Sequence, residues 1–173
     1  MVLWLWYFGG YSFLGWIAER IFAAATHSLT QRRRCLLLLP FCPVYGLGMM
    51  AVLALPASWR QGPWLILSGA IATTIVEYFY HWVCELWFGV WFWDYSGVIG
   101  NLNGRVSLPF TLAWGILSAL AIWIFQPIFQ RLAERTPPVA ALVFLLVFTA
   151  DAVCSARYLT VTHNLEAMRY ALG

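Results

Sequence analysis

Five stretches of predominantly apolar residues run along this chain, and each is long enough to cross a lipid bilayer as a helix. They cover residues 2–25, 40–58, 64–90, 107–129 and 138–161. Hydrophobic residues make up 62% of the 173 residues and charged residues 10%, against about 45–50% and about 25% in soluble domains. So short a chain cannot bury that excess internally. We therefore predict an all-α polytopic membrane protein, a single domain over residues 1–173 built as a bundle of five transmembrane helices.

Two local features refine these helices. Pro127 lies inside the fourth stretch, and we expect it to kink or end that helix, because proline removes a backbone donor and clashes with the preceding turn. Residues 68–74 of the third stretch are mostly small. Small side chains allow another helix to approach closely within a membrane, so we expect a tight helix pair there.

Arginine supplies every cationic side chain, because the sequence contains no lysine. One set of loops, together with the C-terminal end, holds most of the arginines: Arg20, Arg32, Arg33, Arg34, Arg105, Arg157 and Arg169. The opposite loops hold Arg60, Arg131 and Arg135. The positive-inside rule then predicts a multi-pass protein of the inner membrane with its N-terminus outside and its C-terminus in the cytoplasm.

The absence of lysine also excludes two kinds of chemistry. A phosphate-binding loop of the G-x-x-x-x-G-K-[ST] type needs its lysine, and a Schiff-base mechanism needs one as well. We therefore expect no ATP hydrolysis by this chain alone through that motif. We also expect no cofactor and no nucleic-acid partner.

The four cysteines show no C-x-x-C pair and no zinc-ligand spacing; they are Cys35, Cys42, Cys84 and Cys154. Free cysteine is among the most buried residue types and behaves as a small apolar side chain. We expect these residues to serve as apolar filler, with no requirement for an oxidising compartment.

Three ionisable residues stand at spacings of four in the third stretch: Glu77, His81 and Glu85. A helix carries such residues on one stripe. A charged group at the bilayer centre costs about 2.5–3.5 kcal/mol on insertion scales, so we expect the stripe to face a polar interior. His81 could donate to either carboxylate in a proton relay. The bundle signature for metals, Glu-x-x-His contributed twice, is absent, and we predict no metal site.

Further polar residues accompany this stripe. Glu19 in the first stretch and Asp151 in the fifth are also acids within apolar surroundings. The connection "WFWDYSGVIGNLNGRVSLP" is the least lipid-like part of the chain and carries Asp94, Asn101, Asn103 and Arg105. It is either an interfacial connector or a polar segment that lines a cavity. The acids have an alternative role, as hydrogen-bonding groups that only hold helices together, but ionisable groups within a membrane favour a functional path or pocket.

Several motifs occur in a fixed order along the chain: "YSFLGWIAE", "PFCPVYGLG", "EYFYHWVCELWF", "WDYS" and "NLNGRVSLPFTLAWG". Together they resemble the bacterial family named Putative ABC-transporter type IV, whose members are small permease-like membrane proteins. The resemblance covers most of the first four stretches. It implies a membrane permease-like subunit and identifies no substrate. It also implies that ATP hydrolysis comes from a separate ATP-binding subunit.

The resemblance and the stripe together select candidate substrate-binding residues: Glu19, Glu77, His81, Glu85, Asp94, Tyr95, Asn101, Asn103 and Arg105. A permease-like subunit is the leading hypothesis. A membrane-embedded enzyme that acts on a lipid or lipid-linked substrate is the first alternative, but the sequence offers no paired nucleophile and base for it. A non-catalytic accessory or sensor protein is the second. Membrane lipids are expected partners, and a homo-oligomer stays open.

Overall fold

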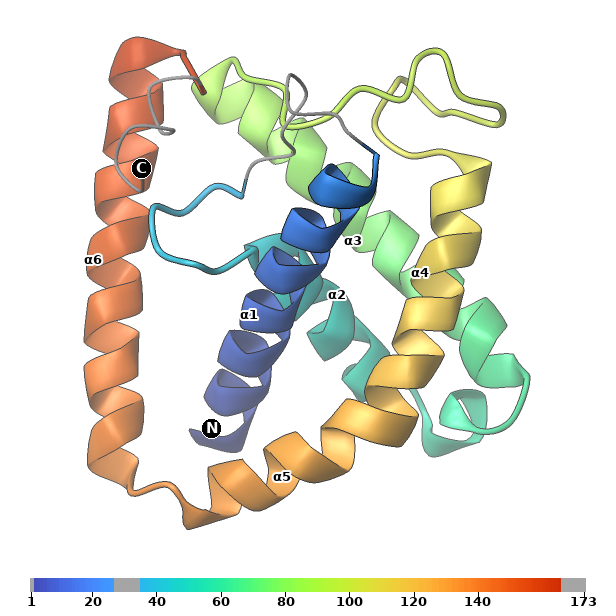
Figure 1. Cartoon of the computed structure of the whole chain (residues 1–173), viewed down its shortest axis with the longest axis vertical. Coiled ribbons are helices and arrows are strands. Elements are labelled where there is room, and N and C mark those ends of the chain that lie inside the picture. Colours follow the sequence, from blue (N-terminus) through green and yellow to red (C-terminus); the bar gives the residue numbers. More distant parts are fainter. Residues whose placement is uncertain (1, 27–34, 166–173) are drawn as a thin grey trace.

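The computed structural model describes residues 2–26 and 35–165 and is all-α over them. Five long helical segments follow one another, the fourth of them subdivided (Figure 1). Their bounds are α1 Val2–Ala25, α2 Pro43–Ala54, α3 Trp64–Phe88, α4 Leu108–Leu120 continuing through the π-helical turn η2 Ala121–Phe125 into α5 Gln126–Arg135, and α6 Pro138–Thr162. A short 3₁₀-helix, η1 Ala57–Arg60, joins α2 to α3. The predicted arrangement of five helical segments is confirmed.

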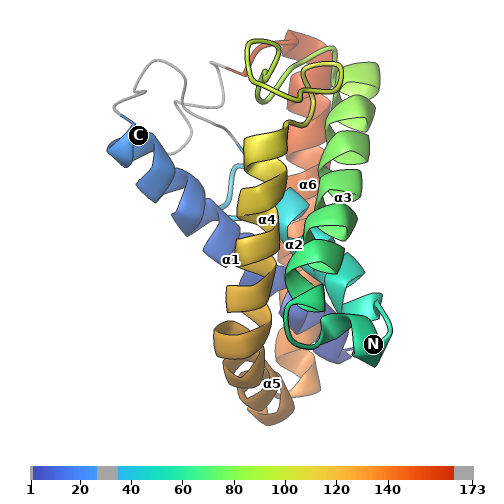
Figure 2. The same cartoon turned by 90° about the vertical axis from the view of Figure 1, so that its right-hand side faces the viewer.

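The segments run alternately between two ends of the molecule. In Figure 1 the ends of α1, α3 and α6 lie at the upper end, together with the 89–107 connection. The start of α1, the end of α2, η1 and α5 lie at the lower end. Figures 1 and 2 both place α3 beside α4, with the 89–107 connection above them.

The outer surface of the bundle is apolar, as a membrane protein requires. The most apolar 18-residue window has a mean hydropathy of 1.9 in Leu108–Arg135 and of 2.2 in Pro138–Thr162, and both helices are long and apolar enough to cross a bilayer. Only 11% of the apolar window of Pro138–Thr162 is buried inside the protein. A core helix of a soluble protein would be mostly buried. The 24 residues of α1 and the 25 of α3 also exceed the span of about 20 residues, but their charged and polar side chains keep them below the hydropathy of the other two.

The prediction of a full-length transmembrane helix over residues 40–58 is wrong. The helix α2 has only 12 residues, a length of about 18 Å, and cannot cross a core of about 30 Å. The preceding residues 35–42 are non-helical and loop toward α6 before they reach the start of α2 (Figure 1). The Cys42 N–H donates to the Ser12 carbonyl at 2.8 Å, about halfway along α1. The second crossing is therefore a non-helical half followed by a half-length helix.

The fourth segment changes direction where the sequence predicts a kink. A π-helical turn, Ala121–Phe125, ends two residues before Pro127. Proline cannot donate to the turn before it, and π-bulges are a recognised cause of sharp bends. Beyond the bend, α5 runs along the lower end of the molecule (Figure 1). The prediction for Pro127 is confirmed.

The tight helix pair expected at residues 68–74 is present between α3 and α4. A Cβ added at Gly69 would lie 2.7 Å from Cβ of Ser118. A Cβ added at Gly115 would lie close to the Ile66 carbonyl oxygen and 3.1 Å from Cβ of Ala70. Glycine on each helix therefore sets the distance between their backbones, and this close approach holds the polar face of α3 against α4.

The cysteines divide into two groups. Cys35 and Cys42 form a disulfide across the non-helical segment, with their Cα atoms 4.8 Å apart. The expectation of filler is wrong for this pair. Cys84 is free and buried, as apolar filler would be, and Cys154 is free and exposed.

Candidate functional site

Glu77 lies in the protein interior, about 20 Å along α3 from Trp64 and only 3% exposed. Its carboxylate accepts two hydrogen bonds from other parts of the chain. Trp114 Nε1 of α4 donates at 2.9 Å, and the Tyr95 hydroxyl of the 89–107 connection donates at 3.2 Å. A carboxylate deep within a membrane protein is stable only when it is paired or hydrated, and these donors satisfy that need.

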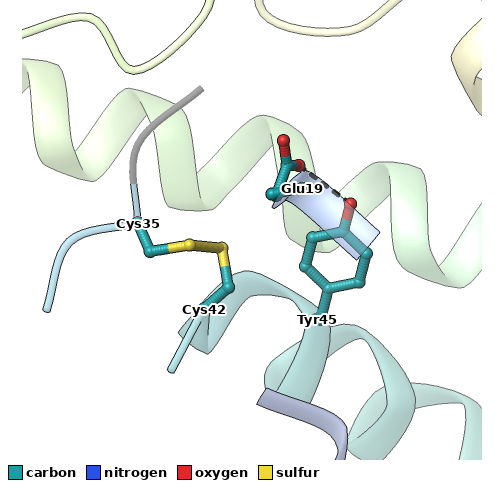
Figure 3. The surroundings of a disulfide bond; sticks show 4 residues. All are labelled: Glu19, Cys35, Cys42 and Tyr45. Atoms are coloured by element: carbon teal, nitrogen blue, oxygen red, sulfur yellow. Dashed lines mark hydrogen bonds between the residues drawn. A yellow bond between two sulfur atoms is a disulfide. The ribbon is translucent and has the colours of Figure 1, made fainter. Parts of the chain in front are cut away.

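The same cluster extends to the first and second segments. The Tyr45 ring, in the first turn of α2, packs against the Trp114 ring with their centroids 4.7 Å apart. The Tyr45 hydroxyl donates to Glu19 of α1 at 2.8 Å, beside the Cys35–Cys42 disulfide (Figure 3). Gly15 makes room for the Tyr45 ring, because a Cβ there would overlap it. We call Glu19, Tyr45, Glu77, Tyr95 and Trp114 the inner cluster.

Glu85, eight residues beyond Glu77, belongs to a different group near the upper end of α3. Arg105 Nη2 donates to its carboxylate at 2.7 Å and Nε at 3.2 Å. The Tyr78 hydroxyl accepts from Arg105 Nη1 at 3.1 Å and from Asn103 Nδ2 at 2.9 Å. The hydrogen bond to Glu85 raises the pKa of Arg105, which stays charged. We call Tyr78, Glu85, Asn103 and Arg105 the rim cluster.

His81 lies between these clusters and joins neither. It is fully buried, stacked on the Trp93 ring at 5.0 Å and packed against the edge of the Trp91 ring at 5.3 Å. Neither ring nitrogen has a hydrogen-bond partner among the described residues. The expectation that His81 donates to a neighbouring carboxylate is therefore wrong, because the two indoles occupy the space around its ring.

Asp94 and Asn101 shape the 89–107 connection instead of pointing into the inner cluster. The Asp94 carboxylate accepts from the Ser96 hydroxyl at 2.6 Å and from the Ser96 N–H at 2.8 Å. These hydrogen bonds lower the pKa of Asp94. Asn101 donates to the carbonyls of Ser96 and Val98 and accepts from the Gly104 N–H. The turn they form fixes Tyr95, whose N–H donates to the Gly104 carbonyl at 2.8 Å.

Asp151 supports the non-helical half of the second crossing. Its two carboxylate oxygens accept from the backbone N–H groups of Leu38 and Leu39, each at 3.2 Å. The Ser155 hydroxyl, one turn along α6, also accepts from the Leu38 N–H at 3.2 Å. Unpaired backbone groups at membrane depth cost several kcal/mol each. Asp151 thus supplies the partners that a helix would have provided.

Sequence reasoning missed Tyr45 and Trp114, which connect the two carboxylates of the inner cluster. One signal could have found Trp114. Tryptophans of membrane proteins gather at the interfaces, whereas Trp114 stands well inside the fourth apolar stretch.

Among the described residues, no group of three or more histidines, cysteines and acids could hold a metal ion. Arg32, Arg33 and Arg34, on which the orientation depends, lie outside the described residues.

These features define a polytopic α-helical membrane protein with an interrupted second crossing and carboxylates enclosed in its interior. The chain belongs to the family Putative ABC-transporter type IV, whose sequence model matches residues 6–156. This confirms the resemblance drawn from the motifs and extends it over most of α6. The comparison with curated proteins gives no match, and neither does the comparison with solved structures.

Proposed function

We propose that this chain is the permease-like subunit of a transporter and that its solute binds at the inner cluster. ATP hydrolysis, in this proposal, comes from a separate subunit. The observation that carries the proposal is the break in the second crossing. Residues 35–42 are non-helical and α2 begins about halfway along α1, and its first turn supplies Tyr45 to the inner cluster.

Interrupted helices have a known use in transporters. Substrate sites of many secondary transporters lie near the bilayer midplane, where broken helices expose their ends and unwound backbone to the ligand. Non-helical backbone at that depth is otherwise costly and occurs where it is buried or lines a cavity. A disulfide and the Asp151 carboxylate stabilise the non-helical segment of the second crossing. This dedicated stabilisation supports a functional role for the break.

The chemistry of the inner cluster indicates what it would accept. Glu19 and Glu77 present carboxylates from two different helices, and Tyr45 and Tyr95 present hydroxyls. Carboxylates favour ligands that carry cationic groups or hydrogen-bond donors. The rim cluster, with Arg105 paired to Glu85, lies between this region and the upper end of α3. We propose Glu85, Asn103 and Arg105 as solute contacts along this route, and Asp94, Asn101 and His81 as residues that hold the 89–107 connection in place.

The proposed function is tested by comparing cells that lack the gene and are complemented with the wild-type chain or with Glu77→Gln. Solutes in cells and medium, and extracted lipids, are measured by mass spectrometry, with equal protein levels verified by immunoblot. We expect the wild-type chain to redistribute at least one solute and Glu77→Gln to abolish that effect. A covalent change in a lipid that depends on Glu77 would instead support the enzyme. No difference in either would leave an accessory role and contradict transport.

The orientation of the chain in the inner membrane is a second proposal, based on the arginine distribution. A reporter that is active only in the cytoplasm, fused after Gly173, is expected to be active. The Cys35–Cys42 disulfide argues in the other direction, because disulfides persist in oxidising compartments. Cys42 is buried within the protein, which shields its sulfur from cytoplasmic thiols, and the proposal keeps the orientation given by the arginines. Activity of a periplasmic reporter at the same position would contradict the proposed orientation.

A further inference from the structure

A groove lies beside the inner cluster, between α1, α2 and the fourth segment, with a volume of about 230 Å³. Its walls are almost entirely apolar. Leu14, Gly15 and Ala18 contribute from α1, Met49 from α2, and Leu117 from α4. Tyr11 and Phe125 also line it.

Most polar side-chain atoms that line this groove already donate hydrogen bonds within the protein. The Tyr11 hydroxyl donates within the protein to the Gln126 side chain, the Tyr45 hydroxyl to Glu19, and Trp114 Nε1 to Glu77. The Ser118 hydroxyl is the remaining one, and it has no partner among the described residues. An ordered water needs two to four polar partners. The groove is therefore built for an apolar occupant.

The position of the groove selects that occupant. The lining residues Ile21, Leu117 and Leu120 are exposed on the outer surface, which in a membrane is surrounded by acyl chains. The lining extends from Tyr11 to Ile21 along α1, about 15 Å at 1.5 Å per residue. The volume exceeds the engineered cavity of about 150 Å³ that holds benzene. It is below the range of about 300–1,000 Å³ typical of pockets for drug-sized ligands. A single flexible chain fits these limits.

We propose that this groove binds one acyl chain of a membrane lipid and that the solute of the inner cluster is an amphiphile entering from the bilayer. Tyr45 and Trp114 form part of the groove wall and also donate to Glu19 and Glu77. The chain would lie against their rings while the polar part meets the carboxylates. This inference names the substrate class of the proposed site and so depends on the proposed function.

Photolabelling of the wild-type chain tests the groove directly. The protein is placed in phosphatidylcholine vesicles that contain a phosphatidylcholine with a diazirine at the end of one acyl chain, and labelled residues are mapped by mass spectrometry. We expect label on Met49 and Phe125 of the groove and none on Val52 and Leu65, which are fully buried elsewhere in the same core. Met49 labelled no more than Val52 would overturn the proposal.

A matched pair of variants sharpens the test. Ala18→Phe fills the groove from α1, whereas Ala24→Phe adds the same ring at an exposed position of α1 outside the groove. We expect Ala18→Phe to reduce labelling of Met49 about tenfold, equivalent to about 1.4 kcal/mol of binding, and Ala24→Phe to leave it unchanged. Equal labelling in the two variants would overturn the proposal. If Ala18→Phe does not fold, the wild-type comparison decides alone.

The two proposals can fail separately. If the groove is not labelled but Glu77→Gln still abolishes solute redistribution, the acyl-chain site is contradicted and the transport function is retained. If the groove is labelled but Glu77→Gln does not change the distribution of any solute, the transport function is contradicted and a lipid-binding groove is retained.

Discussion

Glu77→Leu is expected to lower the melting temperature of the purified protein in detergent by about 10 °C. The substitution leaves Trp114 Nε1 and the Tyr95 hydroxyl without their acceptor in the buried interior. Each unsatisfied group costs about 1–3 kcal/mol, and 1 kcal/mol shifts the melting temperature by about 2–4 °C in a chain of this size. Thermal unfolding followed by circular dichroism measures the change.

Glu77→Gln is the matched variant, because its amide can still accept from Trp114 and can donate to the Tyr95 oxygen. We expect it to melt within a few degrees of the wild-type protein while it loses function. Glu134→Leu, at an exposed position of α5, controls for removing a carboxylate. A Glu77→Leu protein as stable as the Glu134→Leu protein would show that the inner cluster does not hold the bundle together.

Asp151→Ala is expected to release the non-helical half of the second crossing. Removing the carboxylate leaves the Leu39 N–H without its acceptor and the Leu38 N–H with only Ser155. Hydrogen–deuterium exchange read at residues 35–42 should therefore rise from protected to rapid. The expected loss of stability is about 1–3 kcal/mol for the one backbone donor, the Leu39 N–H, that loses its acceptor.

Two neighbouring variants locate the effect. Asp151→Asn keeps one acceptor oxygen and should exchange at an intermediate rate, and Cys154→Ala, at an exposed position of α6, should match the wild type. Unchanged protection of Leu38 and Leu39 in Asp151→Ala would contradict the role assigned to this carboxylate.

Periodicity and apolar length predict much of this fold from sequence. Five stretches give the five helical segments, Pro127 marks the bend, and the spacing of Glu77 places its side chain on an inward stripe. These features depend on local residues and on the cost of placing charge in lipid, so they can be recognised without tertiary contacts.

The break in the second crossing escaped prediction because apolarity alone does not distinguish a helix from a buried non-helical segment. Its local signal was the pair Pro40 and Pro43, since a residue before proline is biased away from helix. The decisive contact, Asp151 with the Leu38 and Leu39 amides, comes from a helix more than 100 residues away. No local pattern encodes it.

The candidate site was predicted only in part for a similar reason. Helical spacing places Glu77, His81 and Glu85 on one stripe, but their partners come from the connection that follows α3 and, for Glu77, also from α4. Arg105 pairs with Glu85, whereas Trp91 and Trp93 enclose His81. How an irregular segment folds back is not readable from periodicity, so one expected stripe became three separate environments.

Carbene labelling of the unmodified chain in bilayers tests most directly whether Glu77 belongs to a closed polar interior. A small apolar diazirine dissolved in the lipid labels residues that face the acyl chains, and labelled positions are mapped by mass spectrometry. Ile75 and Phe79 lie two residues either side of Glu77 and are 52% and 53% exposed. We predict label on both and none on Glu77. Label on Glu77 at the level of Ile75 would show that the carboxylate faces lipid and would contradict the inner cluster.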